Sequence, residues 1–368
     1  MRIVYVLTSL GMGGAERQVL ELAGRMAQRG HTVVVLALRP GVADEWPTRL
    51  NVVHLAMRRS PRSVLAGVAR GRRFLQEFHP DLVHSHSFHA NLVARLLKVL
   101  VPSIPVLSTV HNVYEGGWAR MLAYRLTDGL ARRTVAVSKA AADRFVRLKA
   151  IPRHKCMVMP NGIDTAAFTP DAERREEKRI AMGAGSAFIW LAVGRIVPAK
   201  DYPTLLRAFA QVRAARGEAR LWVAGAETSV VEAARVRALT AESGLEDAVR
   251  WLGLCRDLPA LLDAADAFVL ASAWEGMPLA VGEAMAMEKP VVATDAGGVR
   301  ELVGDAGAIV PVRAPDALAA AMLHLMQSTP EERRALGRAA RERVEKLFSM
   351  DTRADEWEEL YRTILKDL

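Results

Sequence analysis

Short runs of apolar residues alternate along most of the chain with segments whose apolar positions recur at helical spacing. The runs are continuous rather than alternately apolar and polar, which is typical of strands buried on both faces of a parallel sheet. In the first half, the pattern predicts strands at residues 3–8, 32–38, 51–57, 81–86, 106–111, 134–138 and 156–159, with helices between most of them. We therefore expect an α/β fold.

This pattern breaks after residue 159. Pro160-Asn161-Gly162-Ile163-Asp164 is rich in turn formers, and the charged run at residues 173–179 looks like a polar linker. The alternation then restarts, with strands expected at residues 188–193, 220–224, 249–252, 267–271, 290–294 and 309–312, and a long helical tail ends the chain. We predict two Rossmann-like domains, residues 1–165 and 166–350, facing each other across an inter-domain cleft. The helix at residues 351–368 has the N-terminal domain as a candidate packing partner.

Composition narrows the protein class. The chain has 368 residues, of which 51% are hydrophobic and 25% charged, so it can bury a sizeable core and is not a disordered chain. Its two cysteines, Cys156 and Cys255, favour a reducing compartment over a secreted disulfide framework. The first residues are interpreted as a strand rather than a signal peptide, and no apolar run is long enough to span a membrane. We expect a cytoplasmic protein.

The net charge of +9 is unevenly distributed, because residues 1–165 hold 24 Lys and Arg against 10 Asp and Glu, whereas the remainder holds 26 against 31. The predicted helix at residues 63–78 mixes basic and apolar residues, and residues 118–126 could be a second such helix. A basic amphipathic helix is typical of a membrane-surface element, with a solvated basic face as the alternative. The candidate contacts to an anionic membrane or an acceptor are Arg58, Arg59, Arg62, Arg70, Arg72 and Arg73. No nucleic-acid-binding module accompanies the charge, so nucleic acid is not an expected partner.

A glycine loop follows the first predicted strand, where Gly13 and Gly14 precede a helix. Glycines at such a place let backbone N–H groups approach an anion, and the helix N-terminus adds a favourable dipole. The loop lacks the third glycine of the dinucleotide fingerprint and the Gly-Lys-Ser/Thr of a P-loop. A dinucleotide oxidoreductase is therefore not expected, and a glycine turn that serves tight packing remains the alternative interpretation.

Charged residues also follow two strands of the second half. Arg195 and Lys200 follow the strand at 188–193, where two cations suit a diphosphate or are simply solvated. Glu275 lies in a Gly/Pro loop after the strand at 267–271, and Glu283 lies in the next helix. Carboxylates accept hydrogen bonds from the vicinal hydroxyls of a sugar or ribose, and a pair also resembles the acid and base of a glycosidase. An ordinary solvated helix residue is the alternative for Glu283.

Histidines end two strands of the first half. His84-Ser85-His86 closes the strand at 81–86, and a zinc site, a place on the acceptor side of the cleft and a structural role are all open for it. His111 ends the strand at 106–111, where a hydrogen-bonded structural histidine is the alternative to a functional one.

Five elements occur in a fixed order: the Gly-Gly-Ala-Glu-Arg loop, the Pro-Asn-Gly-Ile-Asp linker, Gly194-Arg195 with Lys200, the Glu-Gly-Met-Pro loop, and Glu275 seven intervening residues before Glu283. Together they resemble the family 4 retaining glycosyltransferases (glycosyl transferases group 1), and the resemblance covers nearly the whole chain. It implies the GT-B fold.

The resemblance also implies site residues. His111 and Glu275 would lie beside the reacting sugar as catalytic residues. The donor would be bound by Gly13, Gly14, Arg195, Lys200, Gly276, Met277, Pro278, Leu279 and Glu283, with the ribose on Glu283. The nucleobase would lie near Gly253, Leu254 and Arg256. A nucleotide-sugar, more often a UDP-sugar, is then the donor.

The chemistry requires positive charge near the departing diphosphate. The chain has no Asp-x-Asp motif that would hold a metal for this purpose. Arg195, Lys200 and helix N-termini can supply the field instead, so we expect no metal and no cofactor. No side chain stands out as a nucleophile, and the family resemblance implies retention by same-face attack.

We expect a hexosyltransferase of polysaccharide or lipopolysaccharide biosynthesis. It would act on a lipid-linked or other glycan acceptor, peripherally on the inner face of the cell membrane. The alternatives are a nucleotide-sugar epimerase of the same fold and a non-catalytic nucleotide-sugar-binding protein.

Overall fold

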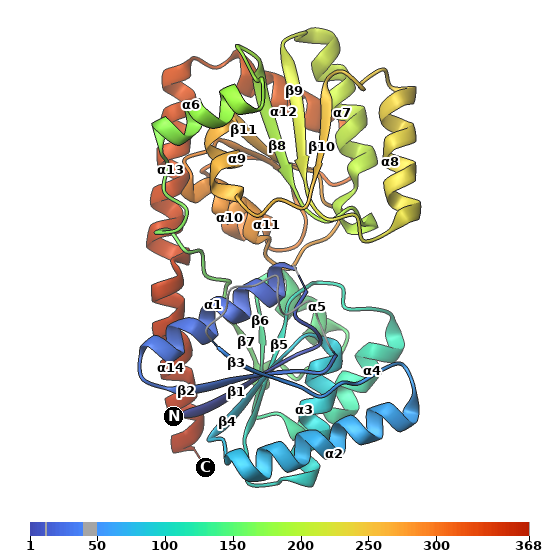
Figure 1. Ribbon diagram of the computed structural model, residues 1–368, viewed down its shortest axis with the longest axis vertical. Coiled ribbons are helices and arrows are strands. Elements are labelled where there is room, and N and C mark those ends of the chain that lie inside the picture. Colours follow the sequence, from blue (N-terminus) through green and yellow to red (C-terminus); the bar gives the residue numbers. More distant parts are fainter. Residues whose placement is uncertain (12, 40–49, 368) are drawn as a thin grey trace. The chain divides into compact units, whose positions relative to one another are not determined.

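The computed structural model describes residues 1–11, 13–39 and 50–367 (Figure 1). Met12 of the glycine loop and Leu368, the last residue of the expected C-terminal helix, lie outside the described residues. The chain forms two compact units. Unit 1 comprises Met1–Gly162 and Met350–Leu368, and unit 2 comprises Ile163–Ser349.

In the described part of unit 1, seven parallel strands form one sheet in the order β3-β2-β1-β4-β5-β6-β7 (Figure 1). The strands are β1 (Arg2–Leu7), β2 (Thr32–Ala37), β3 (Asn51–His54), β4 (Leu82–His86), β5 (Val106–Val110), β6 (Arg133–Ala136) and β7 (Cys156–Val158). The order reverses at β1, which pairs with β2 on one side and with β4 on the other. Ligands of open α/β sheets bind outside the carboxyl ends of the strands at such a switch point.

Helices cover both faces of this sheet. The cores place α1 (Gly14–Gln28) and α14 (Met350–Lys366) on one face. On the other face lie α2 (Pro61–Phe78), α3 (Phe88–Leu100), α4 (Trp118–Thr127) and α5 (Lys139–Arg147). Trp357 and Tyr361 of α14 are buried against β1 and α1, so the end of the chain completes the core of unit 1.

Unit 2, all of whose residues are described, has six parallel strands in the order β10-β9-β8-β11-β12-β13. The strands are β8 (Phe188–Val193), β9 (Ala219–Ala224), β10 (Val249–Gly253), β11 (Ala267–Leu270), β12 (Val291–Thr294) and β13 (Ala308–Val310). The switch point lies at β8, between β9 and β11.

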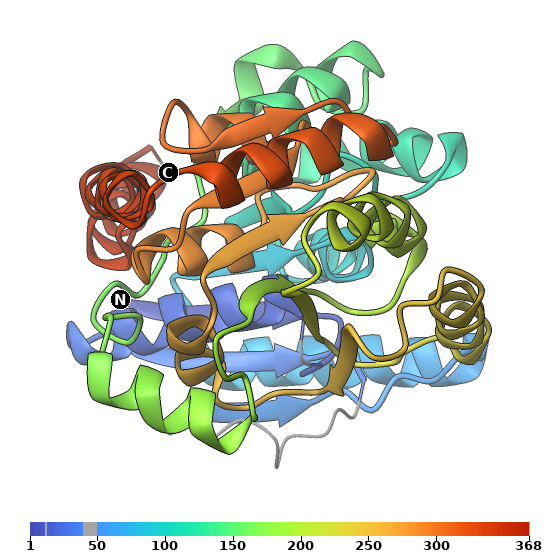
Figure 2. The ribbon, with the colours of Figure 1, turned by 90° about the horizontal axis from the view of Figure 1, so that it is seen from above.

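The helices of unit 2 again flank its sheet. They are α6 (Ala172–Ala181), α7 (Tyr202–Ala215), α8 (Val230–Glu242), α9 (Leu258–Ala264), α10 (Leu279–Ala286), α11 (Val299–Val303), α12 (Pro315–Gln327) and α13 (Pro330–Phe348). On one face, α7 contacts both α8 and α12 and lies between them (Figure 2). The core on this face is built around Trp190 and Phe209, which are fully buried.

One expectation about local structure is wrong. The expected polar linker at residues 173–179 belongs to α6, which begins at a cap where Asp171 accepts from the backbone of Arg174. Its arginines bind far along the chain, where Arg174 and Arg175 pair with Asp263 and Asp266. The long helical tail consists of two helices, because the extended backbone at residue 349 separates α13 from α14, and α14 begins one residue before the helix expected at residues 351–368.

Candidate functional site

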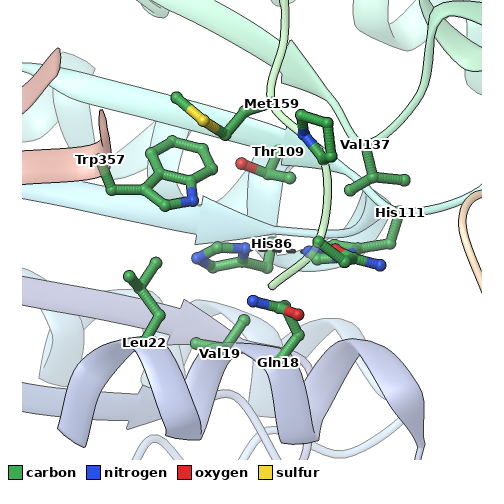
Figure 3. A pocket seen from close by; sticks show the side chains of 11 residues that line it. Gln18, Val19, Leu22, His86, Thr109, His111, Val137, Met159 and Trp357 are labelled. Atoms are coloured by element: carbon green, nitrogen blue, oxygen red, sulfur yellow. Dashed lines mark hydrogen bonds between the residues drawn. The ribbon is translucent and has the colours of Figure 1, made fainter. Parts of the chain in front are cut away.

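A small cavity lies in unit 1 beside the carboxyl ends of β4 and β5 (Figure 3). Its wall includes Gln18 of α1, His86 of β4, Thr109 of β5, His111 after β5, and Trp357 of α14. Alternate residues of a strand point to the same face, which brings the β4 and β5 side chains to the face covered by α1 and α14. The cavity has room for about one water molecule, so it fits a single small polar group.

His86 and His111 contact each other at this cavity. His86 Nδ1 and His111 Nε2 share a hydrogen bond of 3.0 Å, drawn as a dashed line in Figure 3. The outer nitrogens, His86 Nε2 and His111 Nδ1, are buried and have no hydrogen-bond partner among the described residues. Burial lowers the pKa of His111 to about 4 and lowers the pKa of His86 well below its usual range, so both rings are neutral at pH 7.

His84 has a different role, because both of its ring nitrogens are used. His84 Nδ1 bonds the hydroxyl of Tyr361 at 2.7 Å, and Nε2 bonds the hydroxyl of Thr109 at 2.8 Å. Its ring is fully buried, 4.0 Å from the ring of His86 between centroids. Among the residues that the structure describes, no group of three His, Cys, Asp or Glu side chains is placed to hold a metal ion. Of the three interpretations of the His-Ser-His segment, the structure supports the structural one for His84.

The loop after β5 is held by a buried carboxylate. Glu115 Oε1 accepts from the backbone N–H of His111 at 2.9 Å, and Oε2 accepts from the Tyr124 hydroxyl at 2.6 Å. Asn91 of α3 donates in turn to the Tyr124 oxygen at 3.0 Å. Burial raises the pKa of Glu115 to about 7, against the opposing effect of the hydrogen bonds from Tyr124 and the His111 amide. The main chain of His111 is thus anchored to α3 and α4.

In unit 2, two charged residues meet at the switch point. Lys200 Nζ donates to Glu275 Oε1 at 2.6 Å, and the Ser272 hydroxyl donates to the same oxygen at 2.7 Å. The lysine and glutamate side chains are only 18% and 11% exposed. Lys200 follows β8 and Glu275 follows the neighbouring strand β11, so the two strand ends place opposite charges together.

Glycines allow close backbone packing at this strand end. A Cβ at Gly225, after β9, would overlap the carbonyl of Gly194, after β8. A Cβ at Gly194 would lie 2.7 Å from the Cε of Lys200, so the lysine stem lies directly over this glycine. Arg195, the next residue, is exposed. This edge of the unit 2 sheet therefore presents two cations: Lys200, which is paired with Glu275, and Arg195, which is exposed to solvent.

The loop from residue 276 to α10 is buried. Gly276 accepts at its carbonyl from the backbone N–H of Gly298 at 2.9 Å, and α10 starts at Leu279 with Pro278 as its N-cap. Glu283, one turn into α10, is only 2% exposed. The alternative of a solvated helix residue is therefore wrong for Glu283.

Sequence and fold both have known relatives. Residues 12–167 match the model described as Glycosyltransferase Family 4, and residues 187–328 match the model described as Glycosyl transferases group 1. The D-inositol 3-phosphate glycosyltransferase of Segniliparus rotundus is 30% identical over 82% of this chain and 70% of the relative. The chain belongs to the family 4 glycosyltransferases.

Further relatives cover almost the whole glycosyltransferase. The GDP-mannose-dependent alpha-(1-6)-phosphatidylinositol monomannoside mannosyltransferase of Mycobacterium tuberculosis is 29% identical over 93% of this chain and 92% of that protein. The structure of Anabaena Alr3699/HepE in complex with UDP-glucose superposes with a TM-score of 0.88, at 21% identity and 100% coverage of both chains. The expected GT-B fold, with two parallel-sheet α/β domains, is confirmed.

The structure places the other expected site residues of the glycosyltransferase as follows. Gly13 is the N-cap of α1 and Gly14 its first residue. Gly253 ends β10 with a positive φ of 65°, which a glycine adopts without strain. Leu254 is 44% exposed and Arg256 is exposed, and no described contact fixes their side chains on a site. Their assignment to a nucleobase stays a prediction.

The arginines of the basic half separate into two groups. Arg58, Arg59, Arg62 and Arg72 are exposed on α2 or just before it. Arg70 instead donates through Nε to the carbonyl of Leu55 at 3.1 Å, and Arg73 pairs with Glu77 at 2.7 Å. The guanidinium of Arg70 thus binds the backbone just after β3, and a membrane or acceptor role for the six arginines stays a prediction.

Sequence reasoning missed several residues of these clusters. Gln18, Glu115, Ser272 and Trp357 were not expected at a site, and His86 was considered only as part of the His-Ser-His segment. The signal for His86 was the period of two along β4, which places it on the same face as residue 109 of β5 and residue 111 just after β5. No sequence signal pointed to Trp357, because it comes from a helix 246 residues after His111.

Proposed function

We propose that the glycosyltransferase moves a sugar from a UDP-sugar to a lipid-linked or other glycan acceptor, with retention and without a metal ion. The observation that carries the donor part is the buried contact of Lys200 with Glu275 at the switch point of unit 2. An ammonium group suits a diphosphate, and a carboxylate suits sugar hydroxyls. The two side chains together suit the diphosphate and the sugar of a nucleotide-sugar.

The transfer step follows from these roles. Cleavage of the sugar–phosphate bond leaves negative charge on the diphosphate and oxocarbenium character on the sugar. Lys200 and Arg195 stabilise the departing diphosphate, and Glu275, released from Lys200, accepts from hydroxyls of the sugar. The acceptor hydroxyl attacks the face from which the diphosphate leaves. A phosphate oxygen takes the hydroxyl proton as the new glycosidic bond forms, which preserves the anomeric configuration.

The donor nucleotide is the next element of the proposal. The HepE complex with UDP-glucose supports UDP, whereas the mycobacterial relative uses GDP-mannose. Calorimetric titration of UDP, UDP-sugars, GDP and GDP-sugars tests the choice. Tight binding of GDP-sugars alone would replace UDP by GDP, and no binding of any of them would refute the donor site.

Two variants separate the proposed roles. Lys200→Met weakens UDP and UDP-sugar by the same factor, about tenfold or more, because both ligands carry the diphosphate. Glu275→Gln weakens the UDP-sugar, because the sugar reaches the carboxylate, whereas UDP binds at least as tightly as in the wild type, because Lys200 is no longer held in an ion pair. Equal losses of both ligands in Glu275→Gln would contradict its place on the sugar.

A membrane surface is proposed as the place of the acceptor. On α4, Trp118, Leu122 and Leu126 are spaced four apart and are 78%, 42% and 76% exposed, and Arg125 lies beside them. Side chains four apart share one face of a helix, so the three form an apolar stripe. Within the described residues, no helix has both the length and the hydropathy needed to cross a bilayer. The stripe and the exposed arginines of α2 support surface binding to anionic lipid.

Vesicle sedimentation tests this surface. Wild type is expected to bind vesicles containing phosphatidylglycerol and not pure phosphatidylcholine, with loss of binding at high salt. Trp118→Ser with Leu126→Ser should abolish binding, whereas Val230→Ser, which removes an apolar side chain that is 85% exposed on α8, should not. Binding that ignores lipid charge, or that survives the double change, refutes the membrane part only.

A further inference from the structure

The main chain and the ring of His111 are held by different residues. Glu115 accepts a hydrogen bond from the backbone N–H of His111 at 2.9 Å. This bond fixes the backbone position of His111 but not the orientation of its imidazole ring. The ring contact comes from His86, whose Nδ1 lies 3.0 Å from His111 Nε2. His86 is only 2% exposed and lies on β4, a rigid strand in the middle of the sheet.

We infer that His86 is a positioning residue, which orients the imidazole of His111 and sets its tautomer for sugar transfer. This inference rests on the proposed sugar transfer and on the place beside the reacting sugar that the family resemblance implies for His111. With Nε2 engaged by His86, the other ring nitrogen, Nδ1, is the atom of His111 left for a hydroxyl of a bound sugar. A ring that is fixed in advance costs less to order when the substrate binds.

The tautomer follows from counting protons. Both rings are neutral, so each carries one N–H, and the shared hydrogen bond uses one of them. The two outer nitrogens, His86 Nε2 and His111 Nδ1, must therefore be one donor and one acceptor. Whatever favours a donor at His86 makes an acceptor at His111.

Gln18 is a polar side chain that lies at the same cavity as the histidine pair. Its amide nitrogen faces the sulfur of Met350 at 3.9 Å, and its Oε1 is buried without a partner among the described residues. Gln18 and His86 line the same cavity, which has room for one bridging water. A bridging water can donate to Gln18 Oε1 and either donate to His86 Nε2 or accept from it, so this contact is compatible with both arrangements. A sugar hydroxyl at His111 Nδ1 needs a lone pair for its proton, and we therefore place the shared proton on His111 Nε2, which donates to His86 Nδ1. His111 Nδ1 then carries the lone pair that accepts from a sugar hydroxyl.

Ring-nitrogen spectra of ¹⁵N-histidine-labelled protein test the arrangement directly. Both His86 and His111 are expected as Nε2–H tautomers in the ligand-free wild type. In His86→Leu, the His111 signals should move to a mixture of tautomers, and kcat should fall by about 10²-fold with the donor KM nearly unchanged. His86→Asn keeps an amide at the place of Nδ1 and should recover most of kcat.

Tyr361→Phe is the matched control, because it removes a hydrogen bond from His84 on the same face and leaves the His86–His111 contact intact. It should leave the His111 ring signals unchanged. The inference is overturned if His86→Leu folds with unaltered His111 signals and kcat, if Asn is no better than Leu, or if wild-type His111 is protonated at Nδ1. If the wild type transfers no sugar, the proposed function fails, and the ring spectra still decide the geometry of the pair.

Discussion

The contact between Lys200 and Glu275 makes a quantitative prediction about stability. Lys200→Met removes the charge but keeps an apolar stem over Gly194, so the change isolates the electrostatic part. Breaking a fully buried ion pair costs about 3–5 kcal/mol, and breaking an exposed pair costs about 0–1 kcal/mol. The two side chains are 18% and 11% exposed, and Ser272 still donates to the carboxylate, so we expect a loss of about 2 kcal/mol.

The assay is urea and thermal unfolding of four proteins: wild type, Lys200→Met, Glu275→Gln and the double variant. For a unit of this size, about 2 kcal/mol lowers Tm by about 4–8 °C. The double variant should be more stable than Lys200→Met, because it leaves no unpaired charge, and it should still be inactive. Arg300→Met is the control, since its ion pair with Asp295 is exposed and the change should not move Tm. A Lys200→Met protein as stable as wild type, or a double variant less stable than Lys200→Met, refutes the reasoning.

Three further changes have expected outcomes. Gly337→Ala should destabilise unit 2 by about 3 kcal/mol in urea unfolding, because the new Cβ would overlap a backbone carbonyl. Gly24→Ala, where the new Cβ has open space, should be neutral or stabilise the protein by about 0.5–1 kcal/mol. Equal effects of the two changes would contradict the packing around Gly337. Hydrogen bonds, first from Arg362, lower the pKa of Glu358 from 4.5 to about 2, so its contribution is complete above pH 4.5 and is lost as the pH falls towards 2. Glu358→Gln should then cost about 2 kcal/mol at pH 7 and almost nothing at pH 2, and a constant cost across this range would exclude the linkage. Thr329→Ala removes the capping box of α13 and should cost about 1 kcal/mol by thermal unfolding, with no change expected in donor binding.

The strands were predictable because their apolar runs carry the information locally. The run at 188–193 coincides with β8, and the run at 106–111 exceeds β5 by one residue. Helix α6 was not predictable in this way, because it has no buried residues and a strongly polar sequence. It is held by ion pairs such as Arg174 with Asp263, which is 89 positions further along the chain. The periodicity of apolar residues within a segment does not reveal a partner so far away in the sequence.

The site residues were predictable singly and not as contacts. Lys200 and Glu275 each stand out after a strand, but their contact joins positions 75 apart and depends on β8 lying beside β11. From the sequence, His86 could belong to a zinc site, lie on the acceptor side of the cleft or have a structural role. These interpretations could not be separated, because its partner, His111, follows another strand. The register that sets His86 opposite Thr109 brings His111, two residues further on, within reach. Sequence motifs named the chemistry, and strand order decided which groups meet.

The return of α14 to unit 1 has a consequence for synthesis on the ribosome. Unit 2 is continuous in sequence, so its whole core is available once residue 349 has emerged. Unit 1 must wait for Trp357, Leu360 and Tyr361, which close the face of a sheet whose first strand was made more than 300 residues earlier. Domains that are synthesised first usually fold first. Here unit 2 can complete its core before unit 1, although unit 1 contains the first residues of the chain. Nascent unit 1 therefore exposes the apolar face around Tyr5 and Leu22 until α14 has emerged from the ribosome and can pack on it.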